Sequence, residues 1–522
     1  MQAYTVLKQC RFSSDPFTIF SALCKDGDNT VLLESKDGNG KNNVASMLFV
    51  ENALCVEAKG TTVTIKVLTP NGENALSAVT DALASLAPMK SIEGGIEMTF
   101  SGKRPSGDDL TRIKAVYPSE VLRVLSRKWN LGTDDKQRRL SLPGIFSYDH
   151  LEHFEALPAA KHDTLGFADF IFYLPEVAVK VDHEKNAAYV LVHGYNATSY
   201  DAQYSADVAR AEAIARQVEA VTEGTVYNLD KLSGHAVSSD AETDLSDEEY
   251  AALVKKLQHH IVIGDVFQIV PSRTFSADCD DPLTTYGVLR QLNPSPYLFY
   301  LKHGEFTLFG SSPETSVKVE GNPLVASIRP IAGTRRRGRK KDGTIDKDMD
   351  GRLEAELKLN EKELAEHMML VDLARNDVAR VSKPGSRFVS RLLVAERYSH
   401  VMHLVSIVEG ELRDDLDALH AYLASANMGT LVGSPKIEAA KLLRLNENTK
   451  RGPYGGAIGY LTSDGEMDTA IVIRSALVKG QTAYVRAGAG VVFDSDPMAE
   501  AHETRAKASA VLKAIALAKE VK

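Results

Sequence analysis

Cysteine and tryptophan are scarce in this sequence of 522 residues. There is one tryptophan, and the four cysteines are Cys10, Cys24, Cys55 and Cys279. Their spacing gives no C-x-x-C pair and no cluster with histidine that a metal would need. Zinc ribbons, thioredoxin-like redox motifs and small disulfide scaffolds are therefore excluded, and we expect free, reduced thiols.

Long apolar runs and a strong net charge are missing too. No window reaches the ~18 uninterrupted apolar residues of a membrane-spanning helix, and the opening MQAYTVLKQCRF does not have the pattern of a signal peptide. Lys and Arg total 61 against 70 Asp and Glu, a formal charge of -9. This mild acidity argues against general binding to nucleic acid or anionic membranes. We expect a cytoplasmic protein with neither kind of partner.

The composition that remains is that of an ordinary globular protein, with 44% hydrophobic and 25% charged residues. Alternating segments such as TVTIKVLTP are mixed with helical stretches such as ALSAVTDALASL, which favours antiparallel sheets with helices. The chain turns polar from Thr222 to Asp247, and Ser246 with Glu249 then has the spacing of a helix capping box. The sequence therefore predicts an α+β protein with two regions, 1–240 and 241–522.

Two predicted helices in the second region each carry an E-x-x-E pair. Glu363 and Glu366 lie on one stripe of the first helix, and Glu500 and Glu503 on one stripe of the last. Such carboxylates suit Mg²⁺, which prefers hard oxygen ligands and often bridges to an anionic substrate. Either pair alone is more often a solvated face, so the pairs need further context.

Glycine-rich and basic segments between Gly310 and Gly490 supply that context. They are GSSPETS, RPIAGTRRRG, NMGTLVGSPK, RGPYGGAIGY and RAGAGVVF. Glycine lets backbone N–H groups approach an anion and arginine binds carboxylates bidentately, so together they predict a site for a small polyanion. None has the spacing of a nucleotide-binding loop. The basic run from Arg335 to Lys341 has no interleaved aromatics, and we interpret it as an exposed, mobile loop rather than a nucleic-acid site.

These segments occur in an order that resembles one family. SPETS, RPIAGT, KELAEHMMLVDLARND, VMHLVS, GTLVGSPK, RGPYGGAIGY, MDTAIVIRS, AGAGVVFDSDP and ETRAKA resemble the chorismate-utilising enzymes, and among them the large subunits (component I) of anthranilate synthase. The resemblance implies a layered sandwich of large antiparallel sheets covered by helices. It also implies conversion of chorismate and ammonia to anthranilate and pyruvate through 2-amino-2-deoxyisochorismate, the first step of tryptophan biosynthesis.

The same resemblance implies a role for each of the marked residues. Glu314 would be the acid that expels the C4 hydroxyl, and His403 would serve the pyruvate-releasing step. The remaining catalytic set would be Thr334, Gln268 and Glu363. Mg²⁺ would be held by Glu366 and Glu503, with Glu363 and Glu500 in support. Chorismate would be bound by Gly333, Thr334, Thr430, Tyr454, Arg474, Gly488, Ala489, Gly490 and Lys507.

Two positions distinguish branches of the family. Gln268 stands where water-activating relatives carry a lysine, which disfavours ring hydroxylation. Ala332 stands where many aminodeoxychorismate synthases carry a nucleophilic lysine, which disfavours para-amination. Aminodeoxychorismate and aminodeoxyisochorismate synthases stay as alternatives, as does a tryptophan-binding regulatory subunit without catalysis. The intact charged set argues against the last, because a dead site would be free to lose buried charges.

The resemblance also implies regulation and a partner. Segments LLES and NPSPYLFY resemble a tryptophan feedback pocket, in which Glu34, Ser35, Pro296, Tyr297 and Leu298 would hold L-tryptophan. Leu298 stands where family members often have methionine, and the apolar contact is kept. No cysteine lies in a glutaminase-like nucleophile turn. Ammonia would then come from glutamine through a separate amidotransferase subunit (component II), in a heterotetramer of two large and two small subunits.

Overall fold

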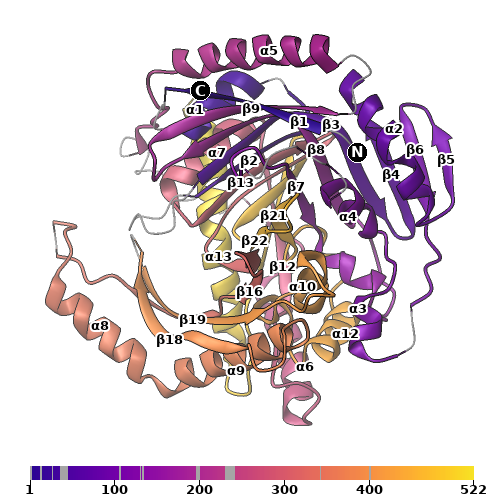
Figure 1. The fold of residues 1–522 in the computed structure, drawn as a ribbon. Helices are drawn as coiled ribbons and strands as arrows, with labels where there is room; N and C mark the ends of the chain where they lie inside the picture. The colour runs from indigo at the N-terminus through magenta and orange to yellow at the C-terminus, as the bar shows by residue number, and fades with distance from the viewer. Residues whose placement is uncertain are drawn as a thin grey trace.

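The computed structural model describes residues 3–11, 15–25, 27–35, 45–104, 107–127, 129, 131, 135–195, 200–229, 241–340, 342–398 and 401–521. Two large sheets are stacked on each other, and helices cover their outer faces, with α5 at one side of the stack and α9 and α12 at the other (Figure 1). In the described part of the chain, every pairing between named strands is antiparallel.

The first sheet combines strands from both ends of the chain. Its strand order is β10 (Glu242–Thr243), β12 (Ser272–Asp278), β24 (Thr482–Gly488), β23 (Ser475–Lys479), β14 (Phe306–Ser312), β13 (Tyr297–His303), β2 (Thr30–Glu34), β3 (Ala45–Lys59), β8 (Phe170–Asp182), β9 (Ala187–Tyr195) and β1 (Ala3–Cys10).

The second sheet is built in the same way. Its order is β5 (Met89–Ile92), β6 (Gly95–Thr99), β4 (Thr62–Val67), β3, β8, β7 (Ser141–Phe146), β21 (Ala457–Thr462), β22 (Met467–Ile471), β15 (Thr315–Glu320), β16 (Val325–Ile328) and β19 (Val401–Glu411). β17 (Ile331–Arg336) continues beyond β16 along β19, and β18 (Phe388–Arg397) lies on the other side of β19. β11 (Gln268–Ile269) and β20 (Gly433–Ser434) form a separate small pair.

The long strands β3 and β8 belong to both sheets. β3 pairs with β2 in its first half and with β4 in its second half, while β8 pairs with it throughout. The register between β3 and β8 shifts between Phe49 and Leu54. Such irregularities bend strands and let one strand pass from one sheet to the next. The two sheets are therefore joined at this corner.

Three apolar layers follow from the alternation of side chains along the strands. The first sheet packs outward against α1 (Pro16–Cys24), α5 (Tyr200–Ala220), α7 (Pro282–Leu292) and α13 (Pro497–Ala518). The facing sides of the two sheets pack on each other. The second sheet packs outward against α2 (Pro70–Ala84), α4 (Glu120–Arg127), α6 (Asp247–Val262), α9 (Glu361–Ala379), α10 (Ala418–Ser425), α11 (Gly429–Val432) and α12 (Lys436–Asn446). The remaining helices are α3 (Asp109–Ile113), η1 (Tyr148–His153) and α8 (Lys347–Leu359).

This architecture confirms the predicted α+β sandwich and several local predictions. α6 begins with the capping box of Ser246 and Glu249, and α13 begins after Asp496, whose side chain accepts from the Ala499 N–H. All four cysteines are buried and free. The division at residue 240 stays a prediction: residues 230–240 lie outside the described part, and strands from both sides of it alternate in both sheets.

The expectation of an exposed loop is wrong for part of the basic run. Arg335 lies in β17 and pairs with Glu356 of α8 at 2.9 Å, and Arg337 pairs with Asp350 at 2.9 Å. The reason is that α8 brings its carboxylates over this segment. Lys341 lies outside the described residues.

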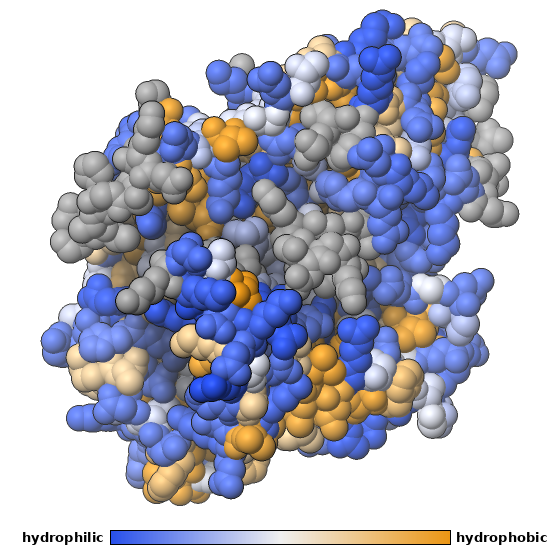
Figure 2. All heavy atoms as spheres, turned by 90° about the vertical axis from the view of Figure 1, so that its left-hand side faces the viewer, coloured by the Kyte–Doolittle hydropathy of each residue, from blue (hydrophilic) through white to orange (hydrophobic). Residues whose placement is uncertain are grey.

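The surface is mostly polar. The face in Figure 2 is largely hydrophilic, with apolar side chains gathered in its lower part, as is usual for globular proteins. No helix in the described ranges combines the length and apolar character that crossing a bilayer requires.

Two neighbouring connections pass between the sheets. β14 of the first sheet continues through Glu314 into β15 of the second, and β22 of the second continues through Arg474 into β23 of the first. The Ile471 N–H donates to the Glu314 carbonyl oxygen at 3.0 Å, and the Ser311 N–H donates to the Arg474 carbonyl oxygen at 3.1 Å. Glu314 and Arg474, far apart in the sequence, are thus neighbours at what we call the sheet crossing.

A buried ion cluster lies beside the crossing. The Glu447 carboxylate accepts from Arg451 Nε at 2.8 Å, from an Arg486 terminal nitrogen at 2.9 Å and from the Ser272 hydroxyl at 2.8 Å. Burial alone would raise the pKa of Glu447, but Arg451 and Arg486 outweigh it and lower that pKa. Arg451 also donates to the carbonyl oxygens of Leu431 and Val270. The cluster therefore fixes the ends of several elements at once.

We predict that Glu447→Gln lowers the free energy of unfolding by about 3–5 kcal/mol, because it leaves two buried guanidinium groups without their counter-ion. Urea unfolding followed by circular dichroism measures the change. The control is Glu212→Gln, which removes a half-exposed partner of Lys8 at 3.2 Å and should cost about 0–1 kcal/mol. Equal losses in both variants would contradict the role given to the cluster.

Candidate functional site

A cavity of about 520 Å³ opens at the sheet crossing and collects nearly all the predicted site residues. It is bounded by the ends of β14, β17, β22 and β24, by β19, and by α9, α11 and α13. The predicted residues that line it are Gln268, Glu314, Gly333, Thr334, Glu363, Glu366, His403, Thr430, Tyr454, Arg474, Gly488, Gly490, Glu500, Glu503 and Lys507. We call it the first cavity.

One predicted residue is absent from this lining. The Ala489 N–H donates to the Pro271 carbonyl oxygen at 3.2 Å and lies 3.3 Å from the Tyr250 hydroxyl, so in this structure it serves the backbone. Lys362 and Arg486 line the cavity without having been predicted. Both lie next to marked residues, Lys362 before Glu363 and Arg486 at the start of the RAGAG segment, but neither stands out from ordinary surface charges in the sequence.

Glu314 sits at the crossing with its side chain buried; the residue is 8% exposed. Burial raises the pKa of its carboxyl to about 8, and Thr430 and Lys507 lower it only in part. A carboxyl with this pKa is protonated at neutral pH and is able to donate a proton. Glu314 therefore has the properties of a general acid.

His403 faces the same cavity from β19. Its Nδ1 lies 2.9 Å from the Thr334 hydroxyl and 3.3 Å from the Gly333 carbonyl oxygen. Since a carbonyl oxygen only accepts, this contact places the hydrogen on Nδ1 and leaves Nε2 as the basic nitrogen. Burial lowers the pKa of the ring. His403 is thus a neutral imidazole at neutral pH, suited to accept a proton.

Arg474 supplies the cavity with a cation. Its backbone has φ 50°, in the left-handed region that non-glycine residues seldom adopt. Burial lowers the pKa of its guanidinium, and the described residues offer it no ion pair. A partly buried arginine without a carboxylate partner is a strong binding point for an anion.

Two glycines keep the cavity open. Gly333 has φ 79°, and a Cβ there would lie 3.1 Å from Glu363 Oε2. A Cβ at Gly490 would lie 2.7 Å from Gln268 Nε2. A side chain at either position would displace the tip of a predicted catalytic residue, and at Gly333 the positive φ disfavours any other residue as well.

The two E-x-x-E pairs face the cavity from different helices, α9 and α13. Their charges are partly met by cations of the chain: Arg335 lies 2.8 Å from Glu363, Lys507 2.7 Å from Glu503 and Lys362 3.9 Å from Glu366. Burial raises the pKa of Glu366 and that of Glu500, and the neighbouring carboxylates add to both. In the described ranges, no three potential ligands converge into a ready metal site.

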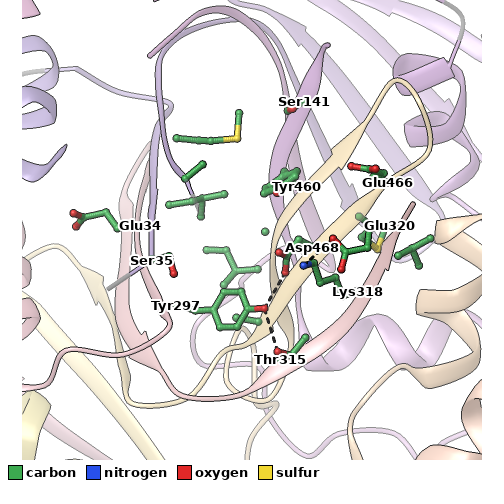
Figure 3. Close-up of a pocket in the computed structure, with 18 of the residues that line it drawn as sticks. Glu34, Ser35, Ser141, Tyr297, Thr315, Lys318, Glu320, Tyr460, Glu466 and Asp468 are labelled. Carbon is green, nitrogen blue, oxygen red and sulfur yellow. Dashed lines mark hydrogen bonds and ion pairs between the residues drawn. The ribbon is translucent and has the colours of Figure 1, made fainter. Parts of the chain in front are cut away.

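A second cavity, of about 510 Å³, lies between the two sheets. Its walls include inward-facing residues of β3, β8, β9 and β13 on one side and of β15, β21 and β22 on the other. All five residues predicted for the inhibitor pocket line it, namely Glu34, Ser35, Pro296, Tyr297 and Leu298. Figure 3 shows Tyr297 in its interior, pointing toward Asp468 and Thr315.

Glu34 differs from the other four. Its carboxylate turns away from Tyr297 (Figure 3) and accepts from the Tyr286 hydroxyl at 2.5 Å and from Arg290 at 2.7 Å. Arg290 also pairs with Asp15 at 2.8 Å. In this structure Glu34 therefore fastens the end of β2 to α7 and leaves its backbone at the cavity.

Comparison with known proteins identifies the family. The family model described as chorismate binding enzyme matches residues 40–513. The chain is 45% identical to anthranilate synthase component 1 of Vibrio cholerae, covering 97% of this chain and 94% of that protein, and 44% identical to that of Escherichia coli, covering 97% and 96%. These matches confirm the resemblance seen in the motifs.

Solved structures agree. The structure of anthranilate synthase component I from Streptococcus pneumoniae matches with a TM-score of 0.68 and 28% identity, covering 90% of this chain and 92% of that one. The menaquinone-specific isochorismate synthase of Escherichia coli matches with a TM-score of 0.66 at 16% identity, covering 98% and 94%, and shows the shared fold. The chain therefore belongs to the chorismate-binding enzyme family.

Proposed function

We propose that the chain converts chorismate and ammonia to anthranilate and pyruvate through 2-amino-2-deoxyisochorismate. The observation that carries the proposal is the pairing, in the first cavity, of a buried carboxyl with a pKa of about 8 and a neutral imidazole. The reaction needs an acid to expel a hydroxyl and a base to remove a ring proton, and these two groups supply them.

Chorismate carries two carboxylates, so its binding needs fixed positive charge. Arg474 would bind one carboxylate bidentately, with the Tyr454 hydroxyl and the backbone at Gly488 beside it. A Cβ at Gly488 would lie 3.1 Å from the Tyr454 hydroxyl, so glycine allows the two to act together. Lys507 donates to the Gly488 carbonyl oxygen at 3.0 Å and steadies this segment.

Amination is the first chemical step. Ammonia attacks C2 of the ring, the double bonds shift, and the C4–O bond breaks as Glu314 gives its proton to the departing hydroxyl, which leaves as water. Without that proton hydroxide would be the leaving group, which is poor. The desolvated position of Glu314 keeps the proton in place at neutral pH.

Pyruvate release is the second step. His403 Nε2 removes the C2 proton, the C3–O bond breaks, the ring becomes aromatic, and the enolpyruvate is protonated to pyruvate. Thr334 and the Gly333 carbonyl oxygen hold the imidazole by Nδ1, which fixes the tautomer that has a basic Nε2.

The acidic pairs fit Mg²⁺ by donor type and by charge. Carboxylate oxygens are its preferred ligands, and burial together with the neighbouring carboxylates raises the pKa of Glu366 and of Glu500, an effect that a bound cation would offset. Glu366 and Glu503 would hold the ion, with Glu363 and Glu500 in support. The ion would neutralise the ring carboxylate of the substrate.

Two lining positions favour ortho-amination by ammonia. Gln268 and Ala332 both line the first cavity, so the positions of the water-activating and the nucleophilic lysines of other branches carry neither group. Ammonia is already a nucleophile and needs less activation than water.

Regulation and assembly complete the proposal. L-tryptophan would bind in the second cavity as the feedback inhibitor of tryptophan biosynthesis. The enzyme would act in the cytoplasm. The relatives are named component 1, which implies a component 2, and we infer that this is a glutamine amidotransferase supplying ammonia in a heterotetramer of two large and two small subunits.

The test is incubation of the purified chain with chorismate, Mg²⁺ and ammonium at mildly alkaline pH. Anthranilate fluorescence and mass spectrometry identify the product, with and without tryptophan. Anthranilate suppressed by tryptophan supports the whole proposal. A different aminated product would overturn it in favour of another chorismate aminase.

For Glu314→Gln we expect kcat to fall by about 10²- to 10⁴-fold, the usual contribution of a general acid. Because the carboxyl must be protonated, wild-type activity should fall as the pH rises through about 8. The pH profile of kcat/KM measures this limb. Glu305→Gln, at a 64% exposed side chain on the β13–β14 turn, should keep both rate and profile, and an unchanged Glu314→Gln profile would remove Glu314 as the acid.

We expect His403→Met to slow pyruvate loss far more than amination, so that 2-amino-2-deoxyisochorismate accumulates. Product ratios by mass spectrometry report this independently of the amount of folded enzyme. The control is His367→Gln: His367 is buried, bonds to Ser406 at 2.7 Å and does not line the cavity. If His403→Met gave anthranilate alone, its role would be different.

Glu366→Gln should raise the Mg²⁺ concentration for half-maximal activity by about tenfold or more, since loss of a charged ligand weakens a hard-cation site. Thermal stabilisation by Mg²⁺ gives a second readout. Glu361→Gln, at an exposed position in the first turn of the same helix α9, serves as the control. Identical Mg²⁺ titrations for both variants and wild type would exclude Glu366 from the site.

A further inference from the structure

One hydroxyl in the second cavity reaches the strands that form the first. Tyr297 Oη lies 3.0 Å from Asp468 Oδ1 and 3.1 Å from Thr315 Oγ1 (Figure 3). Tyr297 belongs to β13 of the first sheet, whereas Thr315 and Asp468 belong to β15 and β22 of the second. The hydroxyl therefore bridges the two sheets across the cavity.

Both partners are close in the chain to the chemical groups of the first cavity. Thr315 directly follows Glu314, and β22, which carries Asp468, ends three residues before Arg474. The two strands are joined at that end by the bond from the Ile471 N–H to the Glu314 carbonyl oxygen at 3.0 Å. A displacement of Tyr297 would therefore act on the acid and on the anion-binding arginine together.

Thr315 is buried in the bridge, Tyr297 and Asp468 are partly buried, and the strand pairing around them is locally irregular. Thr315 is 7% exposed, and burial raises the pKa of the Asp468 carboxyl, so a change in hydrogen bonding there has a large energetic effect. The pairing of β15 with β22 shifts register between Thr315 and Lys318. At such a bulge a strand is less tightly held by its ladder than in regular pairing.

Other links from the second cavity lead elsewhere. Glu34 bonds to Tyr286 and Arg290, on the outer side of the first sheet, and none of these three residues lines the first cavity. His193 bonds to Thr5 at 2.9 Å, in the edge strand β1. Within the described residues, the Tyr297 bridge is the direct one toward Glu314.

We propose that the Tyr297 hydroxyl, through Thr315 and Asp468, couples an amino acid bound in the second cavity to the position of Glu314 and Arg474 in the first. The inference rests on the proposed function, in which the second cavity takes tryptophan and the first takes chorismate. It names the contact by which one site responds to the other.

The test measures coupling directly rather than activity. Isothermal titration gives the Kd of tryptophan for the full chain with Mg²⁺, without ammonium so that amination does not proceed, in the absence and presence of saturating chorismate. The ratio of the two Kd values is the coupling between sites, and linkage makes it independent of catalytic rate. In the wild-type chain we expect chorismate to raise the tryptophan Kd about fivefold or more.

Two variants remove the bridge from its two ends. Tyr297→Phe keeps the ring but loses the hydroxyl, and Thr315→Val keeps the shape but loses one partner. We expect both variants to bind tryptophan. The Kd ratio should fall close to one in Tyr297→Phe, and change less in Thr315→Val, because the bond from Tyr297 to Asp468 remains there. A ratio equal to that of the wild type in Tyr297→Phe would overturn the inference.

A matched control lies on the same strand pair. Thr469 of β22 bonds to the Val317 backbone of β15, donating to its carbonyl oxygen at 2.8 Å, without contact to Tyr297. Thr469→Val should keep the wild-type ratio. If it lost coupling as fully as Tyr297→Phe, general loosening of the strands would explain the effect and the inference would fail. If the wild-type chain bound no tryptophan, the proposed feedback itself would fail, which is a separate outcome.

Discussion

The ion cluster around Glu447 is the constraint on which the functional end of the molecule depends. One buried carboxylate receives two arginines and a serine. Those groups come from three separate parts of the chain, at the end of α12, in β24 and in β12. Burying the carboxylate or either guanidinium without its partner would be strongly destabilising. The cluster therefore holds the three segments together in the folded protein. Arg451 then uses its remaining N–H groups to hold Leu431 and Val270, both of which line the first cavity.

In the first cavity, unlike in the Glu447 cluster, the key ionisable groups are not paired with each other. Arg474 has no carboxylate partner among the described residues, and Glu314 keeps its proton because burial disfavours its ionisation more than Thr430 and Lys507 favour it. Both conditions lower stability, and both suit a dianionic substrate that brings the missing negative charge with it. The left-handed backbone of Arg474 is a further local strain at the site. Such strain is tolerated where substrate binding offsets its free-energy cost.

The fold class and most residues that line the first cavity could be predicted from the sequence, because each of these residues lies at a fixed position in a recognisable motif. The helices α6, α9 and α13 could be placed from periodicity and caps, since Ser246 before α6, Asp496 before α13 and the E-x-x-E spacing in α9 and α13 are local signals. The sheet crossing could not, because strand pairing between Glu314 and Arg474 segments is decided by tertiary contacts far apart in the sequence. The same holds for the partners of Arg335 and Arg337, whose ion pairs exist only once α8 lies over β17. The ion pair between Glu34 and Arg290 could not be predicted from the LLES segment either, because the two residues are far apart in the sequence.

The first cavity has one rigid side and one adjustable side. Glu314 and Arg474 lie in the connections β14–β15 and β22–β23, whose strands are bonded to neighbours in both sheets, so their positions change only when those strands shift. The acidic pairs come from helices, and three of the four carboxylates lie near cations of the chain: Arg335, Lys362 and Lys507. A cation entering there would exchange partners with these side chains rather than add charge to an empty site, which keeps the cost of rearrangement low. The strand-borne groups Glu314 and Arg474 would therefore fix the position of the substrate. The carboxylates of α9 and α13 would set the net charge of the cavity, which changes when a cation binds.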